Sequence, residues 1–492
     1  MEDALGDLYA LLGVSPNASQ DDIHGAFRSA AKRYHPDENP SPAAAVFFRE
    51  VSAAYRILND PTKRAAYDQV LFDNPIEPVL DPVVLQSRQI VPYLGEPQLV
   101  YAMLTLSPPP TPRVEGGHAP LNLVLVIDRS TSMKGARLDQ VKAATNHIID
   151  NLAEEDIVSV VSFSDRSEVV IGATRPFDRR TMKATISTMR ADGATAMYEG
   201  LVGGMKELSQ NLHPRFINHL MLITDGHTYG DEDACLQLAD RAREEGVGVS
   251  AMGIGEDWND VFLDDLVSRT GGSSEYVASH RAVTAFLEER IRSLGTAYAD
   301  NARVIIAPSP QATLDTIFKV SPDPMPLSVD PQPIPLGMLD AHIPTGLILQ
   351  FSLLAEPGSG QELVLGQALV YADILGGQAT ESAVVDMVVE LSDQPVDQVI
   401  PTDLLNALGR LSLFHLQERA REAIDSGNPD EASRRLEFLA TRLFEQGEED
   451  LARAAMAEAQ HVSTTKFISG EGRKKLKYGT RGLVYPRGSA AP

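Results

Sequence analysis

The sequence predicts a multidomain protein that joins an all-α helical hairpin, an α/β doubly wound (Rossmann-like) domain, a β-sandwich and a C-terminal helical segment. Three observations lead to this fold class. The chain has 492 residues, well above the usual size of one domain. Along the chain, the spacing of hydrophobic residues is first helical and then alternates between strand-like and helix-like segments. It becomes strand-like in the next region and is helical again at the end. Its hydrophobic fraction of 43% and charged fraction of 23% are those of a folded, soluble protein.

Residues 1–71 predict two amphipathic helices that pack as an antiparallel hairpin. Apolar or small residues recur at spacings of three and four between Asp21 and Tyr34, and again from about Val46 to Leu58. The tripeptide His-Pro-Asp lies between them. Because proline disfavours helix for the residue before it, the first helix is expected to end near His35 and to leave the motif exposed in a loop.

The whole setting of this motif resembles a J domain, the module of the DnaJ family. LYALLGV precedes a basic helix ending KRYHPD, and a hydrophobic helix ending AYRILNDP is followed by KRAAYD. The resemblance implies docking on a DnaK-type chaperone and stimulation of its ATP hydrolysis. The chaperone-binding residues that it implies are His35, Pro36, Asp37, Arg28, Lys32 and Arg33. For the three basic residues the alternative is an ordinary solvated helix face. With one cysteine in the chain, the zinc module of a full DnaJ is excluded.

Residues 72–95 are rich in proline and acidic residues, and they predict a semi-rigid linker that tethers the helical hairpin. A strand from Leu99, within residues 96–120, is expected to join the sandwich formed by residues 296–395. The β-type runs of that later region are separated by Pro and Gly, which predicts an antiparallel arrangement. Similar sandwiches wrap the neighbouring α/β domain in bacterial relatives of two families, the inter-alpha-trypsin inhibitor heavy chains and the calcium-activated chloride channel family.

Residues 121–295 alternate strands and helices, which predicts an open, mostly parallel sheet with helices on both faces. The run LNLVLVI ends at Asp128 and the run HLMLIT ends at Asp225. Since ligands bind at the carboxyl ends of strands in such sheets, both carboxylates are expected at one edge. Thr195, in DGATAMYEG, is expected on a loop that reaches them.

These positions predict a metal site made only of oxygen ligands: Asp128, Ser130, Ser132, Thr195 and Asp225. Hydroxyls and carboxylates suit a hard cation, with Mg²⁺ expected and Mn²⁺ or Ca²⁺ as alternatives. If hydroxyls bind directly and the aspartates act partly through water, the ion keeps positive charge and attracts an acidic side chain of a protein partner. The structural alternative is that the serines and Asp128 cap the next helix and that TDG is a turn.

The order Asp-x-Ser-x-Ser, loop Thr and later Asp resembles the metal-ion-dependent adhesion site of von Willebrand factor A domains. VVSFSD, GIGEDWND and TGGSSEYV extend this resemblance over about Leu121 to Leu294. It implies an intact site that binds a protein through a divalent ion. Ala194, where many relatives have glycine, is a minor departure.

The end of the chain predicts a helical bundle over residues 401–462, with a loose likeness to tetratricopeptide pairing, and a basic tail over residues 463–492. The tail either docks as a solvated end on the acidic body of the chain or binds a partner. The lone cysteine, Cys235, is expected to be structural.

Several function classes are disfavoured. A net charge of −25 argues against a nucleic-acid groove, and the apolar runs are shorter than the ~18 residues of a membrane span. The start MEDALGDLYA carries acid where a signal peptide carries base, so we expect a cytoplasmic protein. The segment DRSTSMKG lacks a phosphate-binding glycine pattern, and we expect no enzyme. The expected function is a co-chaperone-like adaptor, and the alternative is the scaffold subunit of an AAA+ (MoxR/chelatase-like) ATPase complex.

Overall fold

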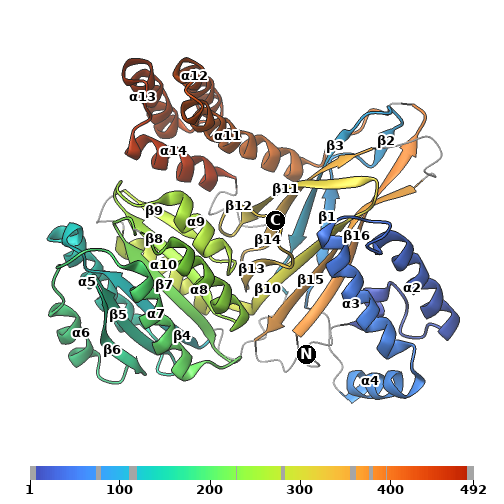
Figure 1. Cartoon of the computed structure of the whole chain (residues 1–492), viewed down its shortest axis with the longest axis horizontal. Coiled ribbons are helices and arrows are strands. Elements are labelled where there is room, and N and C mark those ends of the chain that lie inside the picture. The colour runs from blue at the N-terminus through green and yellow to red at the C-terminus, as the bar shows by residue number, and fades with distance from the viewer. Residues whose placement is uncertain are drawn as a thin grey trace. The chain divides into compact units, whose positions relative to one another are not determined.

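The structure is a computed structural model that describes residues 7–73, 79–109, 119–228, 230–278, 283–354, 362–375, 380–394 and 396–484. The chain divides into two compact units (Figure 1). The first comprises Met1–Glu115 and Tyr298–Leu405, and the second comprises Gly116–Ala297 and Asn406–Pro492. Each unit is built from segments that are far apart in the sequence.

The first unit begins with the predicted helical hairpin, flanked by two further helices. Its helices are α1 (Leu8–Leu12), α2 (Gln20–Tyr34), α3 (Pro42–Leu58) and α4 (Pro61–Asp73). The Ser19 and Asp22 side chains form a capping box that starts α2. The helix ends at Tyr34, and its C-cap residue His35 has an extended φ of −62° and ψ of 136°, as expected for a residue before proline.

These helices pack against a sheet of the same unit. Their core of buried apolar residues continues into Ile305 and Ala307 of one strand and into Leu369 and Tyr371 of the next. The hairpin was expected to be tethered by a linker, and the structure adds a direct packing contact with the sheet. The shared core holds the helices on the sheet. Its side chains come from two regions that the sequence pattern assigned to different domains, the helical hairpin and the β-sandwich.

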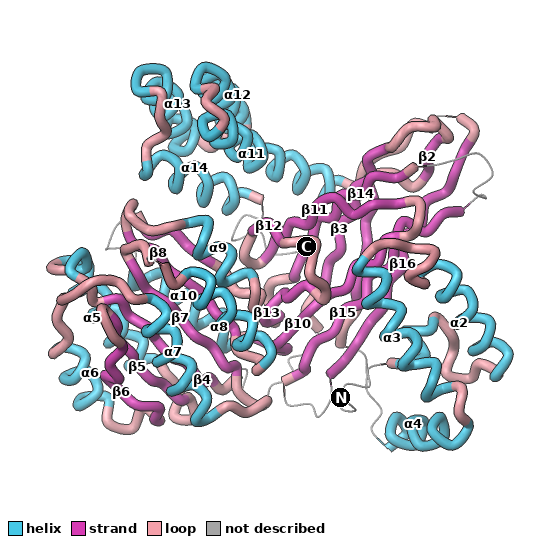
Figure 2. Tube along the Cα trace, in the orientation of Figure 1, coloured by secondary structure: helices cyan, strands magenta, loops and turns pink. Residues whose placement is uncertain are grey.

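Two five-stranded sheets form the rest of the first unit (Figure 2). Their orders are β1-β3-β14-β11-β12 and β13-β10-β15-β16-β2, and every pairing described is antiparallel except that of β16 with β2. The strands are β1 (Pro82–Gln86), β2 (Ile90–Pro92), β3 (Gln98–Leu106), β10 (Ala297–Pro308), β11 (Ala312–Ser321), β12 (Met325–Leu327), β13 (Ile334–Asp340), β14 (Thr345–Leu353), β15 (Glu362–Ile374) and β16 (Thr380–Ser392).

Two of these strands correct the predicted linker. β1 and β2 lie inside residues 72–95, and β1 pairs with β3 with Val84 opposite Leu104. Prolines hid them from the sequence pattern, but Pro82 is the first residue of β1 and Pro92 the last of β2. Proline is tolerated at strand ends because the ladder needs no N–H there. The sheets thus begin before residue 96.

The second unit contains the predicted doubly wound domain, with a six-stranded sheet in the order β6-β5-β4-β7-β8-β9. The strands are β4 (Leu121–Asp128), β5 (Ile157–Phe163), β6 (Ser167–Thr174), β7 (Ile217–Thr224), β8 (Gly248–Ile254) and β9 (Ser274–Val277). The helices are α5 (Ala136–Asn151), α6 (Arg179–Ser187), α7 (Met197–Leu208), α8 (Glu232–Glu244), α9 (Asp260–Ser268) and α10 (Val283–Gly295), with two short 3-10 turns, η1 (Thr131–Met133) and η2 (Ser209–Asn211). Every residue of β4 is buried, as expected for a central parallel strand. The partly exposed edge strand β6, which pairs antiparallel with β5, was not predicted.

Four helices complete this unit: α11 (Thr402–Asp425), α12 (Pro429–Glu445), α13 (Glu449–Thr465) and α14 (Gly470–Leu483). α11 to α14 share one apolar core, which includes Leu436, Leu443 and Leu476. The helical bundle therefore extends beyond residue 462. The expected basic tail is a packed helix rather than a solvated end, but it does dock on acidic residues of the chain, because Lys477 and Arg481 pair with Asp264. Residues 485–492 lie outside the described residues. In the described part of the chain, no helix combines the length and apolarity needed to cross a membrane.

A candidate metal centre and a candidate chaperone-binding loop

Two buried carboxylates meet at the carboxyl edge of the central sheet. Asp128 ends β4 and Asp225 follows β7, and neither side chain is exposed. Thr224 donates a 2.6 Å hydrogen bond from Oγ1 to Asp128 Oδ2. The parallel pairing of β4 with β7 explains why residues almost a hundred positions apart lie at one edge.

Both serines of the motif turn toward these carboxylates. The Ser130 backbone N–H donates to Asp128 Oδ1 at 2.8 Å, and the Ser130 and Ser132 hydroxyl oxygens are 3.1 Å apart. Ser132 in turn donates a 2.7 Å hydrogen bond from Oγ to Asp225 Oδ1. Helix α5 starts after Gly135 without a side-chain cap, so the serines do not cap that helix. Their hydroxyls face the carboxylates instead.

Thr195 completes the oxygen set from a third loop. A Cβ placed on Gly226 would lie 3.2 Å from Thr195 Oγ1 and 3.9 Å from Asp128 Oδ2, so the threonine hydroxyl lies beside the same edge. The loop is fastened close by, because Thr131 donates from N and Oγ1 to the Gly193 carbonyl at 3.0 and 2.9 Å. All five predicted residues are therefore brought together.

One of the fastenings of this loop depends on a glycine. Gly193 has φ +81°, and a Cβ there would lie 2.6 Å from Asp165 Oδ2. Asp165 also accepts a 2.9 Å hydrogen bond from the Ala194 N–H through Oδ1. Sequence reasoning assigned no role to Gly193 or Asp165. The D-G pair before Ala194 is a turn signal that marks a position of this kind.

The charges of the site are unevenly compensated. Burial raises the pKa of Asp128, hydrogen bonds from Ser130 and Thr224 lower it, and the nearby Asp225 carboxylate raises it. The Arg137 guanidinium lies 2.5 Å from Asp225 Oδ2 through Nη1, an ion pair that sequence reasoning missed. A basic residue in the first turn of α5 opposes the helix dipole, which is a signal that its charge is used elsewhere.

This donor set fits a hard divalent ion. Carboxylate and hydroxyl oxygens converge from three loops, and the carboxylates are withdrawn from water. In the regions that the structure describes, no group of three or more His, Cys, Asp or Glu side chains is suited to a metal. An ion at this edge would therefore rely on hydroxyls and would keep part of its positive charge uncompensated.

The His-Pro-Asp motif lies in the loop after α2, with its ends open to solvent. The exposed fraction of the side chain is 45% for His35 and 86% for Asp37. His35 Nδ1 accepts a 3.2 Å hydrogen bond from the Asp37 N–H and lies 3.6 Å from Asp37 Oδ2. Of the basic residues on α2, Arg28 and Lys32 are exposed and Arg33 is half-buried. The motif and the basic face are accessible while the helices stay packed on the sheet.

Three family models match separate parts of the chain. Residues 7–68 match the DnaJ domain, residues 122–289 match the von Willebrand factor type A domain, and residues 402–486 match the Sll0103-like, C-terminal alpha-helical domain. The first two are typically non-catalytic interaction domains.

Curated relatives resemble this chain in part. The uncharacterized protein sll0103 of Synechocystis sp. is 33% identical over 214 residues, which cover 43% of this chain and 51% of that protein. The chaperone protein DnaJ of Roseiflexus sp. is 52% identical over 63 residues, which cover 13% of this chain and 17% of that protein. The chain thus spans about half of the first relative and less than a fifth of the second.

Solved structures share the fold more widely. A von Willebrand factor type A protein from Catenulispora acidiphila aligns with a TM-score of 0.66 at 19% identity, covering 82% of this chain and 96% of that one. The ArnB paralog VWA2 from Sulfolobus acidocaldarius aligns with a TM-score of 0.52 at 13% identity, covering 82% and 98%. Together with the family matches, they show that this chain combines a DnaJ domain, a von Willebrand factor type A domain and an Sll0103-like C-terminal α-helical domain.

Proposed function

We propose that this protein is a non-enzymatic adaptor in the cytoplasm. Its DnaJ domain recruits a DnaK-type chaperone and stimulates that chaperone's ATP hydrolysis. Its von Willebrand factor type A domain binds a protein partner through Mg²⁺. The observation that carries the proposal is that one chain holds an exposed His-Pro-Asp loop and a convergent set of hydroxyl and carboxylate oxygens.

The chaperone half of the proposal is supported by what the packing leaves open. The helices of the DnaJ domain use their apolar faces to pack on β10 and β15, whereas Arg28, Lys32 and Asp37 remain exposed. Positive charge beside the motif would steer an acidic chaperone surface toward it. The partner would therefore meet a DnaJ domain that is already fixed on its own sheet.

The partner-binding half rests on the chemistry of the oxygen set. The hydroxyls of Ser130, Ser132 and Thr195 would hold the ion, and the buried carboxylates of Asp128 and Asp225 would supply negative charge to its surroundings. A bound Mg²⁺ supplies a positive centre with positions left for an outside oxygen ligand. We propose that this outside ligand is the carboxylate of an Asp or Glu side chain of the partner protein.

One pull-down tests both halves. Tagged wild type, His35→Gln and Asp128→Ala proteins are incubated with cell extract containing either Mg²⁺ or EDTA, and bound proteins are identified. We expect a DnaK-type chaperone to be lost only in His35→Gln, and a second partner to be lost in EDTA and in Asp128→Ala. Partners indifferent to the metal would contradict the second half. An AAA+ ATPase bound in place of DnaK would favour a scaffold subunit.

A further inference from the structure

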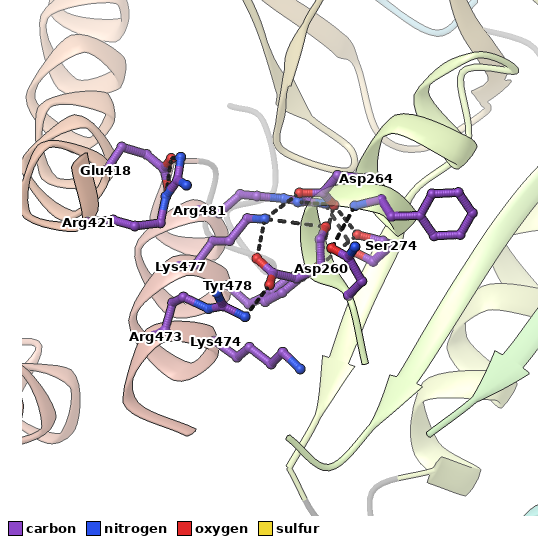
Figure 3. Close-up of polar contacts among 12 residues, drawn as sticks. Asp260, Asp264, Ser274, Glu418, Arg421, Arg473, Lys474, Lys477, Tyr478 and Arg481 are labelled. Atoms are coloured by element: carbon purple, nitrogen blue, oxygen red, sulfur yellow. Dashed lines mark hydrogen bonds and ion pairs between the residues drawn. The ribbon is translucent and has the colours of Figure 1, made fainter. Parts of the chain in front are cut away.

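Helix α14 of the C-terminal domain is attached to α9 of the von Willebrand factor type A domain by buried ion pairs (Figure 3). Lys477 Nζ lies 2.7 Å from Asp260 Oδ2 and 2.8 Å from Asp264 Oδ2. Arg481 Nη1 lies 3.0 Å from Asp264 Oδ1. The side chain of Asp260 is 2% exposed and that of Asp264 14%. Since unpairing a charge at such depth is costly, α14 is held firmly in place.

One turn before these ion-paired residues of α14, Lys474 binds the loop between β8 and α9. Its side chain is fully buried, and its ammonium donates hydrogen bonds to the backbone carbonyls of Glu256 and Trp258, the latter at 2.6 Å. Lys474 Nζ also lies 4.3 Å from the centre of the Trp258 ring. The position of this loop, residues 255–259, is thus set by a helix of the neighbouring domain.

At its first residue the same loop lies close to Arg137. Gly255 has φ +75°, and a Cβ placed on it would lie 3.2 Å from Arg137 Nη2. The other guanidinium nitrogen, Nη1, is the one that lies 2.5 Å from Asp225 Oδ2. Arg137 therefore lies between the loop and a carboxylate of the candidate metal centre. Trp258 Nε1 donates a 2.8 Å hydrogen bond to the Gly255 carbonyl, so a path of neighbouring residues leads from Lys474 to Asp225.

We propose that Lys474 and Arg137 are positioning residues that together lower the affinity of the candidate metal centre for a divalent ion. Arg137 places a positive charge on Asp225, which offsets the negative charge that an ion would use. The loop confines Arg137 there, and Lys474 confines the loop. Undocking of α14 would free Arg137 from Asp225 and tighten ion binding. The inference rests on the proposed function, because it requires that the centre binds an ion.

Calorimetric titration of the full chain with Mg²⁺ and with Mn²⁺ tests the path. The variants are Arg137→Met, Lys474→Met and the double variant, with Lys475→Met as the control because Lys475 is an exposed neighbour on α14. We expect each of the first two to tighten binding by about fivefold or more, the size of a typical coupling between sites. The double variant should equal Arg137→Met, and the control should equal wild type.

Hydrogen exchange without metal supplies a second readout. Lys474→Met should speed exchange of the amides of residues 255–259, and Lys475→Met should not. If Lys474→Met does not keep the native thermal transition, Lys474→Gln, which retains an N–H donor, replaces it with the same expected direction.

Two results would overturn the inference while leaving the proposed function intact. One is faster loop exchange in Lys474→Met with unchanged or weaker ion binding. The other is additive effects of the two substitutions in the double variant, since residues acting on one path do not add. Wild-type protein that binds no ion, like Asp128→Ala, would instead overturn the proposed metal function and this inference with it.

Discussion

The side-chain amide of Asn39 donates a 2.9 Å hydrogen bond from Nδ2 to the carbonyl of Pro308, and so joins the loop after the His-Pro-Asp motif to the end of β10. The same nitrogen donates to the Arg33 carbonyl at 3.1 Å, and Asn39 Oδ1 accepts from the Ser41 N–H at 3.1 Å. One buried side chain thus ties the end of α2, the start of α3 and the sheet together. It fixes the DnaJ domain on the sheet while His35 and Asp37 stay exposed.

Replacing Asn39 should loosen this attachment. In Asn39→Ala the buried carbonyl of Pro308 loses its side-chain donor, which is expected to cost about 1–3 kcal/mol in the free energy of unfolding. Urea unfolding measures the loss, and hydrogen exchange should quicken in residues 33–41 and 305–309. Glu38→Ala, an exposed neighbour, is the control. Equal stability and exchange in the two variants would contradict a fastening role for Asn39.

His35→Gln should separate chaperone stimulation from folding. The imidazole is nearly half exposed and its described polar contacts are within its own loop, so the melting temperature should stay within about 1 °C of wild type, in line with surface substitutions. Stimulation of DnaK ATPase should fall to the level without this protein. His24→Gln, on an exposed face of α2, serves as the matched histidine control. Retained stimulation by His35→Gln would remove the chaperone half of the proposal.

The sequence was informative where local chemistry decides the structure. Pro36 ended α2 where expected, and the apolar runs before Asp128 and Asp225 placed both carboxylates at one sheet edge. These results depend on neighbouring residues and on the rule that parallel strands present one edge. The convergence of the five oxygen residues followed from the same logic.

The features that the sequence did not predict depend on contacts between distant residues. No local sequence pattern around Arg137 predicts its ion pair with Asp225. Likewise, no pattern in α14 predicts the hydrogen bond from Lys474 to the carbonyl of Trp258. β1 was hidden because its pattern is short and proline-rich, and it becomes a strand only by pairing with β3. Long-range pairing, rather than propensity, made these elements.

Asp128→Asn should reveal what the buried carboxylates are for. Without metal, the substitution replaces a buried carboxyl whose pKa is raised by burial and by the nearby Asp225. The free energy of unfolding should therefore be unchanged or slightly higher. Excess Mg²⁺ should raise the melting temperature of wild type, because an ion that binds only the folded state stabilises it, and should leave Asp128→Asn unaffected. Differential scanning calorimetry with and without Mg²⁺ measures both effects. A Mg²⁺-dependent rise retained in Asp128→Asn would mean that the ion binds elsewhere.

The docking of α14 should weaken in acid through Asp264. Burial alone would raise the pKa of Asp264, but Arg481, Lys477 and the hydrogen bonds from Lys477 and Ser274 lower it from 3.8 to about 2. A carboxyl whose pKa is lower in the folded state stabilises that state at pH values above its ordinary pKa, and the stabilisation disappears as the pH falls from about 4 to 2. The difference between the two pKa values corresponds to about 2 kcal/mol.

The chain carries its own probe of this effect. Trp258 is the one tryptophan in the sequence, and its ring centre lies 5.8 Å from that of Tyr478 on α14. Urea titrations followed by Trp258 fluorescence at pH 7 and at pH 3 should show wild type losing stability relative to Asp264→Asn as the pH falls, since the variant has no carboxyl to protonate. Glu471→Gln, an exposed acid on α14, should follow wild type. If Asp264→Asn and wild type lost stability in parallel, the pH dependence would belong to other carboxylates and the ion pairs of α14 would contribute little to its docking.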